Sequence, residues 1–284
     1  MSRIAYVNGA YVPMDMAFVH IEDRGYQFAD GVYEGITVAG GKLVDLEPHL
    51  DRLERSLREL QIDMPMGRRA MAIVFKETIG RNRLRDAFLY IQVTRGVAKR
   101  DHPFPAEAVP TLVVTARRLD LAAVKARAEV GIKVSSQPDI RWGRCDVKSI
   151  SLLPNILAKQ AAREAGSFEA VLYDEDGHVT EGSSTNIWMV AKNGTLVTRS
   201  TGDNILPGIT RATLMKIAGE LQMKVEERAF TLEEAKSASE MFLTSSTSCA
   251  MPIVEFDGAQ IGDGTPGATA KRLAEAYWAY IDAA

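Results

Sequence analysis

The chain has 284 residues, of which 46% are hydrophobic and 25% are charged, and its formal net charge is −3. This composition is typical of a folded globular protein with a sizeable core. The small negative charge gives no sign of a nucleic-acid-binding surface. The longest unbroken apolar runs have six residues, whereas a helix that spans a bilayer needs about 20. We therefore expect neither nucleic acid nor a membrane as a partner.

The start of the chain and the cysteines indicate the compartment. Met1–Tyr6 lacks the apolar core and the cleavage site of a signal peptide. Cys145 and Cys249 lie far apart and form no CxxC pair, so the sequence predicts neither a disulfide framework nor a zinc site. These features favour a cytoplasmic protein.

The first part of the chain is expected to combine short strands with helices. The expected elements, in order, are strands over 33–39 and 42–44, helices over 47–61 and 70–79, and strands over 87–94 and 111–116. Gly40 and Gly41 can adopt the positive φ angles that a two-residue hairpin turn requires. In the first helix, apolar residues recur at steps of three and four, which marks one buried face. They are Leu50, Leu53, Leu57 and Leu60.

A charged, alanine-rich stretch over 118–131 interrupts the strand pattern and is predicted to link two domains. The smaller α/β domain would cover 1–117, and the larger domain 132–284, with an active site where the two meet. About two domains is also what the chain length suggests, at roughly 150 residues per domain.

The second part is expected to alternate hairpins with helices. The expected elements are a strand over 132–135, a helix over 152–164, strands over 170–173 and 186–190, a helix over 209–221, strands over 240–244 and 253–256, and a helix over 267–281. Asp174–Gly177 and Asn193-Gly194 are turn signals, and Thr231 with Glu234 predicts a capping box. The helix over 152–164 is expected to turn its leucines and isoleucine inward: Leu152, Leu153, Ile156 and Leu157, with Ala161.

The spacing of these elements favours an α+β fold. Many connections between strands are too short for crossover helices, so mixed, mostly antiparallel sheets are preferred to a Rossmann arrangement. Consistent with this, the sequence has no GxxxxGK[ST], GxGxxG or GxSxG motif. Its four histidines show no metal-binding spacing, so no metal site is predicted.

Four short segments carry groups that suit chemistry on a phosphorylated cofactor. Gly208–Thr210 opens a helix, whose free N–H groups suit a phosphate, and Thr244–Ser248 offers further hydroxyl donors. On pattern alone, each is more often an ordinary turn or cap. Lys148 is either a solvated lysine or, if buried beside cations, a Schiff-base nucleophile. Glu181 is either a turn residue or a carboxylate that holds a pyridinium proton.

Together these stretches resemble the class IV aminotransferases, which depend on pyridoxal 5′-phosphate (PLP), and most closely the D-amino acid transaminases. The matching motifs occur in order over nearly the whole chain: residues 22–34 (EDRGYQFADGVYE), 49–53, 95–96, 100–102, 146–149, 155–160, 180–186, 208–211 and 242–252. A single motif of this kind would be only suggestive, whereas the ordered set is highly specific. The resemblance implies the two-domain fold type IV architecture.

The resemblance also implies how the cofactor is held. Lys148 would form the Schiff base with PLP and later move a proton between the substrate Cα and the cofactor. Glu181 would keep the pyridine nitrogen protonated. The phosphate would be bound by Arg52, Ser246, and the backbone of Ile209 and Thr210 with the Thr210 hydroxyl, while Leu206 would pack against the ring.

For the substrate, the resemblance assigns the α-carboxylate to Tyr33, Arg100 and His102. Because Lys148 serves only one face, the side on which the carboxylate binds would decide between D- and L-amino acids. The family places the Arg-x-His loop in the neighbouring subunit's site, which implies a homodimer. Gly35-Ile36 after Tyr33-Glu34 is instead similar to the branched-chain enzymes, which leaves the side-chain pocket open.

The sequence therefore predicts a ping-pong transamination, through a pyridoxamine form, between a D-amino acid and a 2-oxo acid. D-Alanine and D-glutamate are the first candidates for the D-amino acid. Three alternatives stay open at this point. They are an L-branched-chain aminotransferase, an aminodeoxychorismate lyase on the same scaffold, and a non-enzymatic binding protein.

Overall fold

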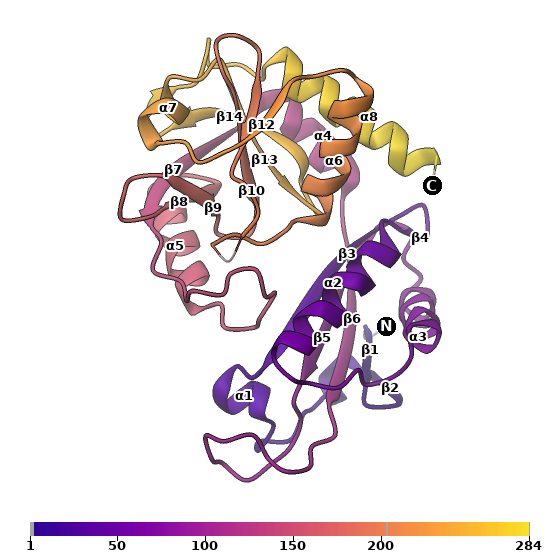
Figure 1. Ribbon diagram of the computed structural model, residues 1–284. Helices are drawn as coiled ribbons and strands as arrows, with labels where there is room; N and C mark the ends of the chain where they lie inside the picture. Colours follow the sequence, from indigo (N-terminus) through magenta and orange to yellow (C-terminus); the bar gives the residue numbers. More distant parts are fainter. Residues whose placement is uncertain (1–2, 203, 284) are drawn as a thin grey trace. The chain divides into compact units, whose positions relative to one another are not determined.

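The computed structural model describes residues 3–202 and 204–283. It divides into two compact units, coloured along the sequence in Figure 1. Unit 1 comprises Met1–Asp120 and Val147–Ser151, and unit 2 comprises Leu121–Asp146 and Leu152–Ala284. Among the helices in the described residues, none is long and apolar enough to cross a membrane.

Unit 1 is built on a six-stranded antiparallel sheet with the order β2-β1-β6-β5-β3-β4. Its strands are β1 (Ile4–Val7), β2 (Ala10–Pro13), β3 (Gly31–Ala39), β4 (Lys42–Leu43), β5 (Ala87–Thr94) and β6 (Thr111–Arg118). Its helices are the 3₁₀ turn η1 (Met14–Met16), α1 (Arg24–Phe28), α2 (Leu46–Glu59) and α3 (Arg68–Arg81). Gly40 and Gly41 both have positive φ angles in the β3–β4 turn, as the hairpin prediction requires.

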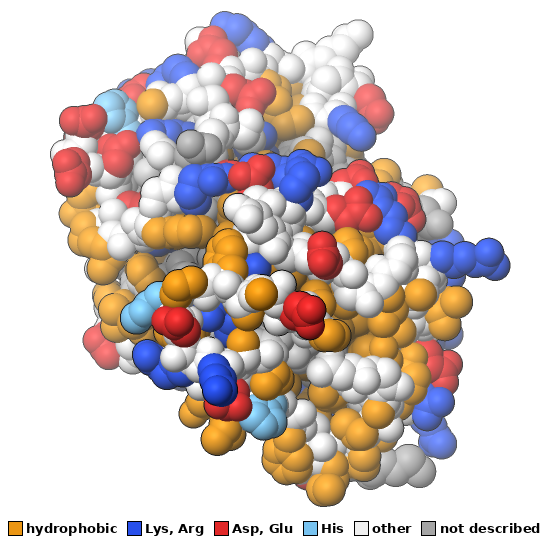
Figure 2. Space-filling view, turned by 60° about the horizontal axis from the view of Figure 1, so that its bottom comes forward, with side chains coloured by type: hydrophobic (Ala, Val, Ile, Leu, Met, Phe, Trp, Pro, Cys, Tyr) orange, Lys and Arg blue, Asp and Glu red, His pale blue; other side chains and the backbone are white. Residues whose placement is uncertain are grey.

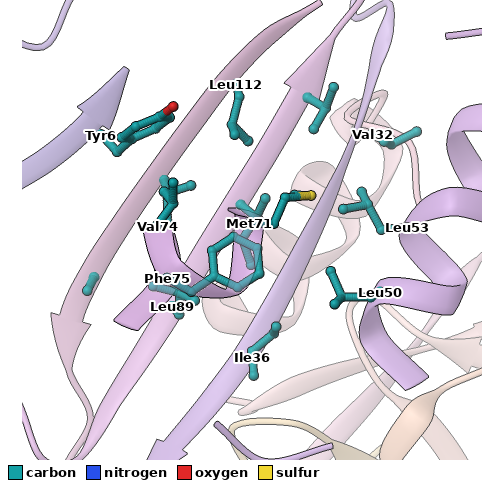
Figure 3. Close-up of a cluster of buried hydrophobic side chains, with 14 of the residues drawn as sticks. Tyr6, Val32, Ile36, Leu50, Leu53, Met71, Val74, Phe75, Leu89 and Leu112 are labelled. Carbon is teal, nitrogen blue, oxygen red and sulfur yellow. The ribbon is translucent and has the colours of Figure 1, made fainter. Parts of the chain in front are cut away.

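Helices α2 and α3 share one hydrophobic core with the sheet (Figure 3). Leu50, Leu53 and Leu57 of α2 are each 1% exposed, so the predicted leucine face is confirmed. Alternate residues of the strands supply the sheet side of this core, among them Val32 and Ile36 of β3. Tyr33, which follows Val32 directly, points to the other face of the sheet, because successive side chains of a strand alternate between its faces.

A segment far along the chain completes the edge of this sheet. Val147–Ser151 belongs to unit 1, and Ser149 forms an antiparallel bridge with Val32 at the start of β3. Backbone hydrogen bonds from Tyr33 N to Lys148 O and from Ile150 N to Gly31 O, both 3.0 Å, fix the pairing. The pairing holds the backbone of Lys148 beside Tyr33.

Unit 2 contains a nine-stranded mixed sheet with the order β12-β11-β10-β13-β14-β7-β8-β9, and β15 pairs with β14. Its strands are β7 (Ile132–Pro138), β8 (Glu169–Tyr173), β9 (Val179–Gly182), β10 (Asn186–Val190), β11 (Leu196–Thr198), β12 (Val225–Glu227), β13 (Glu240–Ser245), β14 (Cys249–Phe256) and β15 (Ala259–Gln260). Three neighbouring pairs are parallel and the others antiparallel. The prediction of an α+β fold with mixed, mostly antiparallel sheets is confirmed.

Helices accompany this sheet in the described part of unit 2: α4 (Leu121–Val130), α5 (Leu153–Glu164), α6 (Ile209–Glu220), α7 (Leu232–Lys236) and α8 (Ala268–Ala283). Helix α4 occupies most of the stretch predicted as a linker. Thr231 and Glu234 form the predicted capping box at the start of α7. The hairpin turn at Asp174–Gly177 closes with a backbone hydrogen bond of 2.9 Å.

The orientation predicted for α5 is wrong. Leu153, Ile156 and Leu157 are 67%, 59% and 54% exposed, and the buried residues of this helix are Ala158 and Ala162. These alanines form a small core with Ala170 and Leu172 of β8, because small side chains allow the helix backbone to lie close to the sheet. The larger apolar residues are left on the outer surface.

Candidate active site

The lysine predicted to bind the cofactor lies in unit 1, next to an aromatic ring. Lys148 Nζ is 4.2 Å from the centroid of the Tyr33 ring. The backbone N–H of Lys148 donates to Ser56 Oγ on α2 at 3.4 Å. Residues far apart in the sequence therefore meet at the edge of β3, which places a primary amine beside one of the predicted substrate-binding groups.

A second tyrosine continues this surface of the sheet. The Tyr90 ring of β5 lies 5.7 Å from the Tyr33 ring, and the Tyr90 hydroxyl donates to Gln92 Oε1 at 2.7 Å. Burial, with a smaller effect of Tyr33, raises the pKa of Tyr90 to about 12. Tyr90 is therefore a neutral hydrogen-bonding group at any physiological pH.

Arg52, the predicted phosphate ligand, is held by a buried carboxylate of the same unit. Its Nε and Nη2 each donate to one oxygen of Glu34 at 2.8 Å, and His49 Nδ1 lies 2.7 Å from Glu34 Oε2. Burial by itself would raise the pKa of Glu34, but the charge and hydrogen bonds of Arg52, joined by His49, bring it well below its usual range. The paired charges fix the position of the Arg52 guanidinium.

Arg100 and His102 lie in the long connection between β5 and β6 of unit 1, and both are exposed. The Arg100 guanidinium carbon is 4.8 Å from the centroid of the Phe28 ring. The His102 ring is 5.7 Å from the same phenyl group. The two residues are thus grouped around one side chain of α1.

Glu181, predicted to face the pyridine nitrogen, lies at the end of β9 in unit 2 and is 5% exposed. Its Oε2 accepts from Asn186 Nδ2 and from the backbone N–H of Leu206, both at 3.1 Å. Its Oε1 accepts from Arg141 Nη1. Glu181 is thus a buried carboxylate whose position is fixed by donors on both of its oxygens.

Arg141 belongs to an ion-pair chain that the sequence analysis did not find. Its Nε and Nη2 donate to the two oxygens of Asp139 at 2.8 and 2.6 Å, and Asp139 also accepts from the Thr180 hydroxyl at 2.7 Å. Burial disfavours the Arg141 charge, but Asp139 and Glu181 outweigh it and raise the pKa of Arg141. The positive charge at this position is permanent and adjoins Glu181.

The predicted phosphate-binding segments also lie in unit 2. Gly208 is the N-cap of α6, with no side chain capping the helix, and the first amides of a helix have no acceptor within it. The Thr210 side chain lies in this first turn, and Ser246 lies in the turn between β13 and β14. These are the donors that a phosphate ester requires.

Asn186 links the two parts of the unit 2 site. Besides its bond to Glu181, its Nδ2 donates to Leu206 O at 3.0 Å. A Cβ atom at Gly208 would collide with Asn186 Oδ1. Asn186 also pairs with Thr244 of β13, two residues before Ser246. One side chain therefore connects the acid, the Leu206 loop and the start of α6.

Each unit thus brings together part of the predicted site. Unit 1 holds Lys148, Tyr33 and Arg52, with Arg100 and His102 in its long loop, and unit 2 holds Glu181, Leu206, Ile209, Thr210 and Ser246. The roles of these residues stay predictions. Glu34 as the partner of Arg52 and Arg141 as the partner of Glu181 were not predicted from the sequence. Neither ion pair has a spacing signal, because the partners are 18 positions apart in one case and 40 in the other.

Unit 1 thus offers a primary amine, and unit 2 offers a buried acid and a helix start whose first amides have no acceptor within the helix. A family model described as amino-transferase class IV matches residues 31–256. The chain belongs to the class IV aminotransferases, and it is an enzyme of the transamination class. Members of this family use PLP.

The chain is also similar to individual aminotransferases over nearly its whole length. The chain is 40% identical over 266 residues to a D-alanine aminotransferase of Bacillus licheniformis, a match that covers 94% of this chain and 93% of the relative. Its fold is similar to the branched-chain amino acid aminotransferase of Escherichia coli, with a TM-score of 0.90, 24% identity and coverage of 98% and 94% of the two chains. The branched-chain aminotransferase of Thermoproteus uzoniensis, solved with norvaline, gives a TM-score of 0.86 at 26% identity, with coverage of 98% and 94%.

Proposed function

We propose that this protein transfers the amino group of a D-amino acid, with D-alanine and D-glutamate as first candidates, to a 2-oxo acid. The observation that carries the proposal is the position of Lys148 Nζ, 4.2 Å from the ring of Tyr33. It places the reactive amine beside a group proposed to receive the substrate α-carboxylate. The 40% identity to a D-alanine aminotransferase supports the same substrate class.

Each unit supplies part of the set of groups that PLP binding requires. Glu181 offers a buried carboxylate for a protonated ring nitrogen. The start of α6, the Thr210 and Ser246 hydroxyls and Arg52 offer phosphate ligands, and Leu206 an apolar contact for the ring. When bound, PLP supplies an electron sink for the pair of electrons left at the substrate Cα.

The residues of the chain then have separate tasks. Lys148 would hold the cofactor through its amine, and the same amine would serve as the base that takes the proton from the substrate Cα. Glu181 would keep a proton on the ring nitrogen, while the Arg141 guanidinium donates a hydrogen bond to the Oε1 atom of its carboxylate. Asn186 holds the Glu181 carboxylate in place by a direct hydrogen bond.

Stereochemistry follows from where the carboxylate binds. Arg100 provides a guanidinium that can bind a carboxylate with two parallel hydrogen bonds. His102 and the Tyr33 hydroxyl add directed donors. Since Lys148 removes the proton from one face only, a carboxylate held on the side of these three residues selects the D-enantiomer.

The same proposal includes a homodimer. Unit 1 exposes apolar side chains near its loop and N-terminal segment: Phe18, Ile21, Tyr26, Phe104 and Val109 are 53% to 83% exposed. In Figure 2, which brings the bottom of Figure 1 forward, hydrophobic side chains are grouped on the surface. Large exposed apolar groups favour burial against another chain. Light scattering of the purified holoenzyme tests this, and a monomeric mass would refute it.

The experiment that tests the activity is a half-reaction panel. The holoenzyme is mixed with D-alanine, L-alanine or L-leucine, and the loss of its yellow absorbance is followed before 2-oxoglutarate is added. We expect D-alanine to react at least tenfold faster than either L-amino acid. Reaction with L-leucine alone would refute the stereochemical assignment. The cytoplasmic location stays a prediction.

A further inference from the structure

A buried arginine supports the loop that carries Arg100 and His102. We propose that Arg24, together with Phe28, is a positioning residue that holds this loop in the geometry needed to bind the substrate α-carboxylate. The proposal rests on the proposed function, because it takes Arg100 and His102 as the carboxylate ligands. Arg24 itself has no part in the chemistry.

Arg24 donates to three successive backbone carbonyls of the loop. Its Nη1 lies 2.6 Å from Asp101 O and 3.4 Å from Pro103 O, and its Nη2 lies 3.3 Å from His102 O. The Arg24 side chain is 4% exposed. A buried guanidinium that satisfies three consecutive carbonyls fixes the backbone between them, because each broken bond would leave a donor unsatisfied.

The Arg24 side chain is itself held in place by Asp30. Its Nε donates to Asp30 Oδ2 at 2.7 Å, and Asp30 also binds Arg95 at 2.7 and 3.0 Å. Burial by itself would raise the pKa of Asp30, but Arg95 and Arg24 outweigh it and lower the pKa. Asp30 therefore stays ionised, and it keeps Arg95 as a partner when Arg24 is replaced.

The ring of Phe28 contacts the functional side chains directly. It lies 4.8 Å from the guanidinium carbons of Arg24 and of Arg100 and 5.7 Å from the His102 ring. A cation over an aromatic face is attracted by the ring quadrupole. Phe28 thus orients the side chains, while Arg24 orients the backbone that carries them.

The base of the loop is paired with the segment that precedes α1. Arg24 N donates to Gly96 O at 2.9 Å, and Ala98 N donates to Glu22 O at 3.2 Å. Asp23 and Val97 form a bridge between these hydrogen bonds. The pairing keeps Arg24 under the loop where the loop leaves β5.

The loop over residues 95–110 has no secondary structure of its own that would hold Arg100 and His102 in place. Residues 95–110 contain no helix or strand, and connections of this length without secondary structure are uncommon unless they serve function. Arg100 and His102 are exposed and carry rotatable side chains, so binding a carboxylate with an unsupported loop would cost conformational entropy. Support by Arg24 and Phe28 removes much of that cost before the substrate arrives.

The first test is the Arg24→Met holoenzyme in the half-reaction with D-alanine and with ethylamine. Ethylamine is D-alanine without its carboxylate, so it makes no use of Arg100 or His102. We expect KM for D-alanine to rise about tenfold while the rate with ethylamine stays within twofold of wild type. Arg81→Met is the matched control, since Arg81 has one ion pair and one aromatic contact in the same unit. It should change neither reaction.

The second test reads the loop without using activity. Lys99 and Arg100 are trypsin sites, and we expect Arg24→Met and Phe28→Leu to increase cleavage there at least fivefold over wild type and Arg81→Met. Phe28→Leu keeps an apolar side chain at a half-buried position, so it decides the question if Arg24→Met fails to fold. Equal losses with D-alanine and ethylamine, or an unchanged cleavage rate, overturn the proposal. If wild type ignores D-alanine, the proposed function is wrong, and cleavage alone decides whether Arg24 orders the loop.

Discussion

Replacing Arg141 with methionine tests how the charge of Glu181 is stabilised. The substitution removes a cation that is 6% exposed in its side chain and that binds the carboxylates of Asp139 and Glu181. Removing one member of a buried ion pair typically costs about 3–5 kcal/mol, because the remaining charge is left unpaired. Glu181 keeps Asn186 as a donor and Asp139 keeps Thr180. We therefore expect the low end of that range, about 3 kcal/mol of unfolding free energy.

In the intact protein, tryptophan fluorescence can report this loss of stability for unit 2 specifically. All three tryptophans, at positions 142, 188 and 278, belong to that unit, so their fluorescence during heating follows its unfolding. At roughly 2–4 °C for each kcal/mol in a domain of this size, the expected decrease in Tm is about 6–12 °C. Arg144→Met is the control. Arg144 also pairs with a buried aspartate, but the Arg144 side chain is itself 41% exposed, so its loss should lower Tm less than the loss of Arg141.

A neutral triple variant separates lost charge pairing from lost packing. With Arg141→Met, Asp139→Asn and Glu181→Gln combined, no uncompensated charge remains at this position, and most of the lost Tm should return. The variant should still fail to transaminate, because an uncharged amide in place of the Glu181 carboxylate cannot hold the ring nitrogen proton. The reasoning is refuted if Arg141→Met lowers Tm by less than about 2 °C, the least expected for 1 kcal/mol, or if the triple variant is less stable than the single one.

Three further predictions concern single residues. Lys148→Ala should abolish turnover with an unchanged circular dichroism spectrum, and borohydride should no longer fix PLP to the chain; retained activity would contradict the assignment. Glu34 has a depressed pKa, so its stabilising ion pair is present above the ordinary value of 4.5 and is lost as pH falls. Glu34→Gln should accordingly be less stable than wild type at neutral pH, with a gap in Tm that narrows as the solution is made acidic; a constant gap argues against the pair. Gly208→Ala should weaken PLP binding to the apoenzyme at least tenfold, because the new Cβ would collide with Asn186. Gly219→Ala, in the open part of α6, should leave the PLP affinity unchanged. Equal affinities of the two variants would contradict the role assigned to the start of α6.

Local patterns in the sequence were sufficient where the signal lies within one element. The leucine spacing of α2, the glycine turn between β3 and β4 and the capping box of α7 all appear as predicted. Helix α5 shows the limit of this reasoning. Its apolar periodicity predicts a buried face, yet Leu153, Ile156 and Leu157 are exposed and the alanines pack on the sheet. Periodicity identifies an apolar stripe but not the surface that the stripe meets.

The sequence alone determined the class of this protein, because its motifs occur in a fixed order along the chain and each motif is local. The tertiary structure decided how the candidate groups are supported. Arg24 reaches carbonyls 77 to 79 positions away, and Arg141 reaches Glu181 across 40 positions. Partners of this kind have no spacing rule, because a hydrogen bond or ion pair depends on the distance between atoms in space. Only the folded chain brings those atoms within reach.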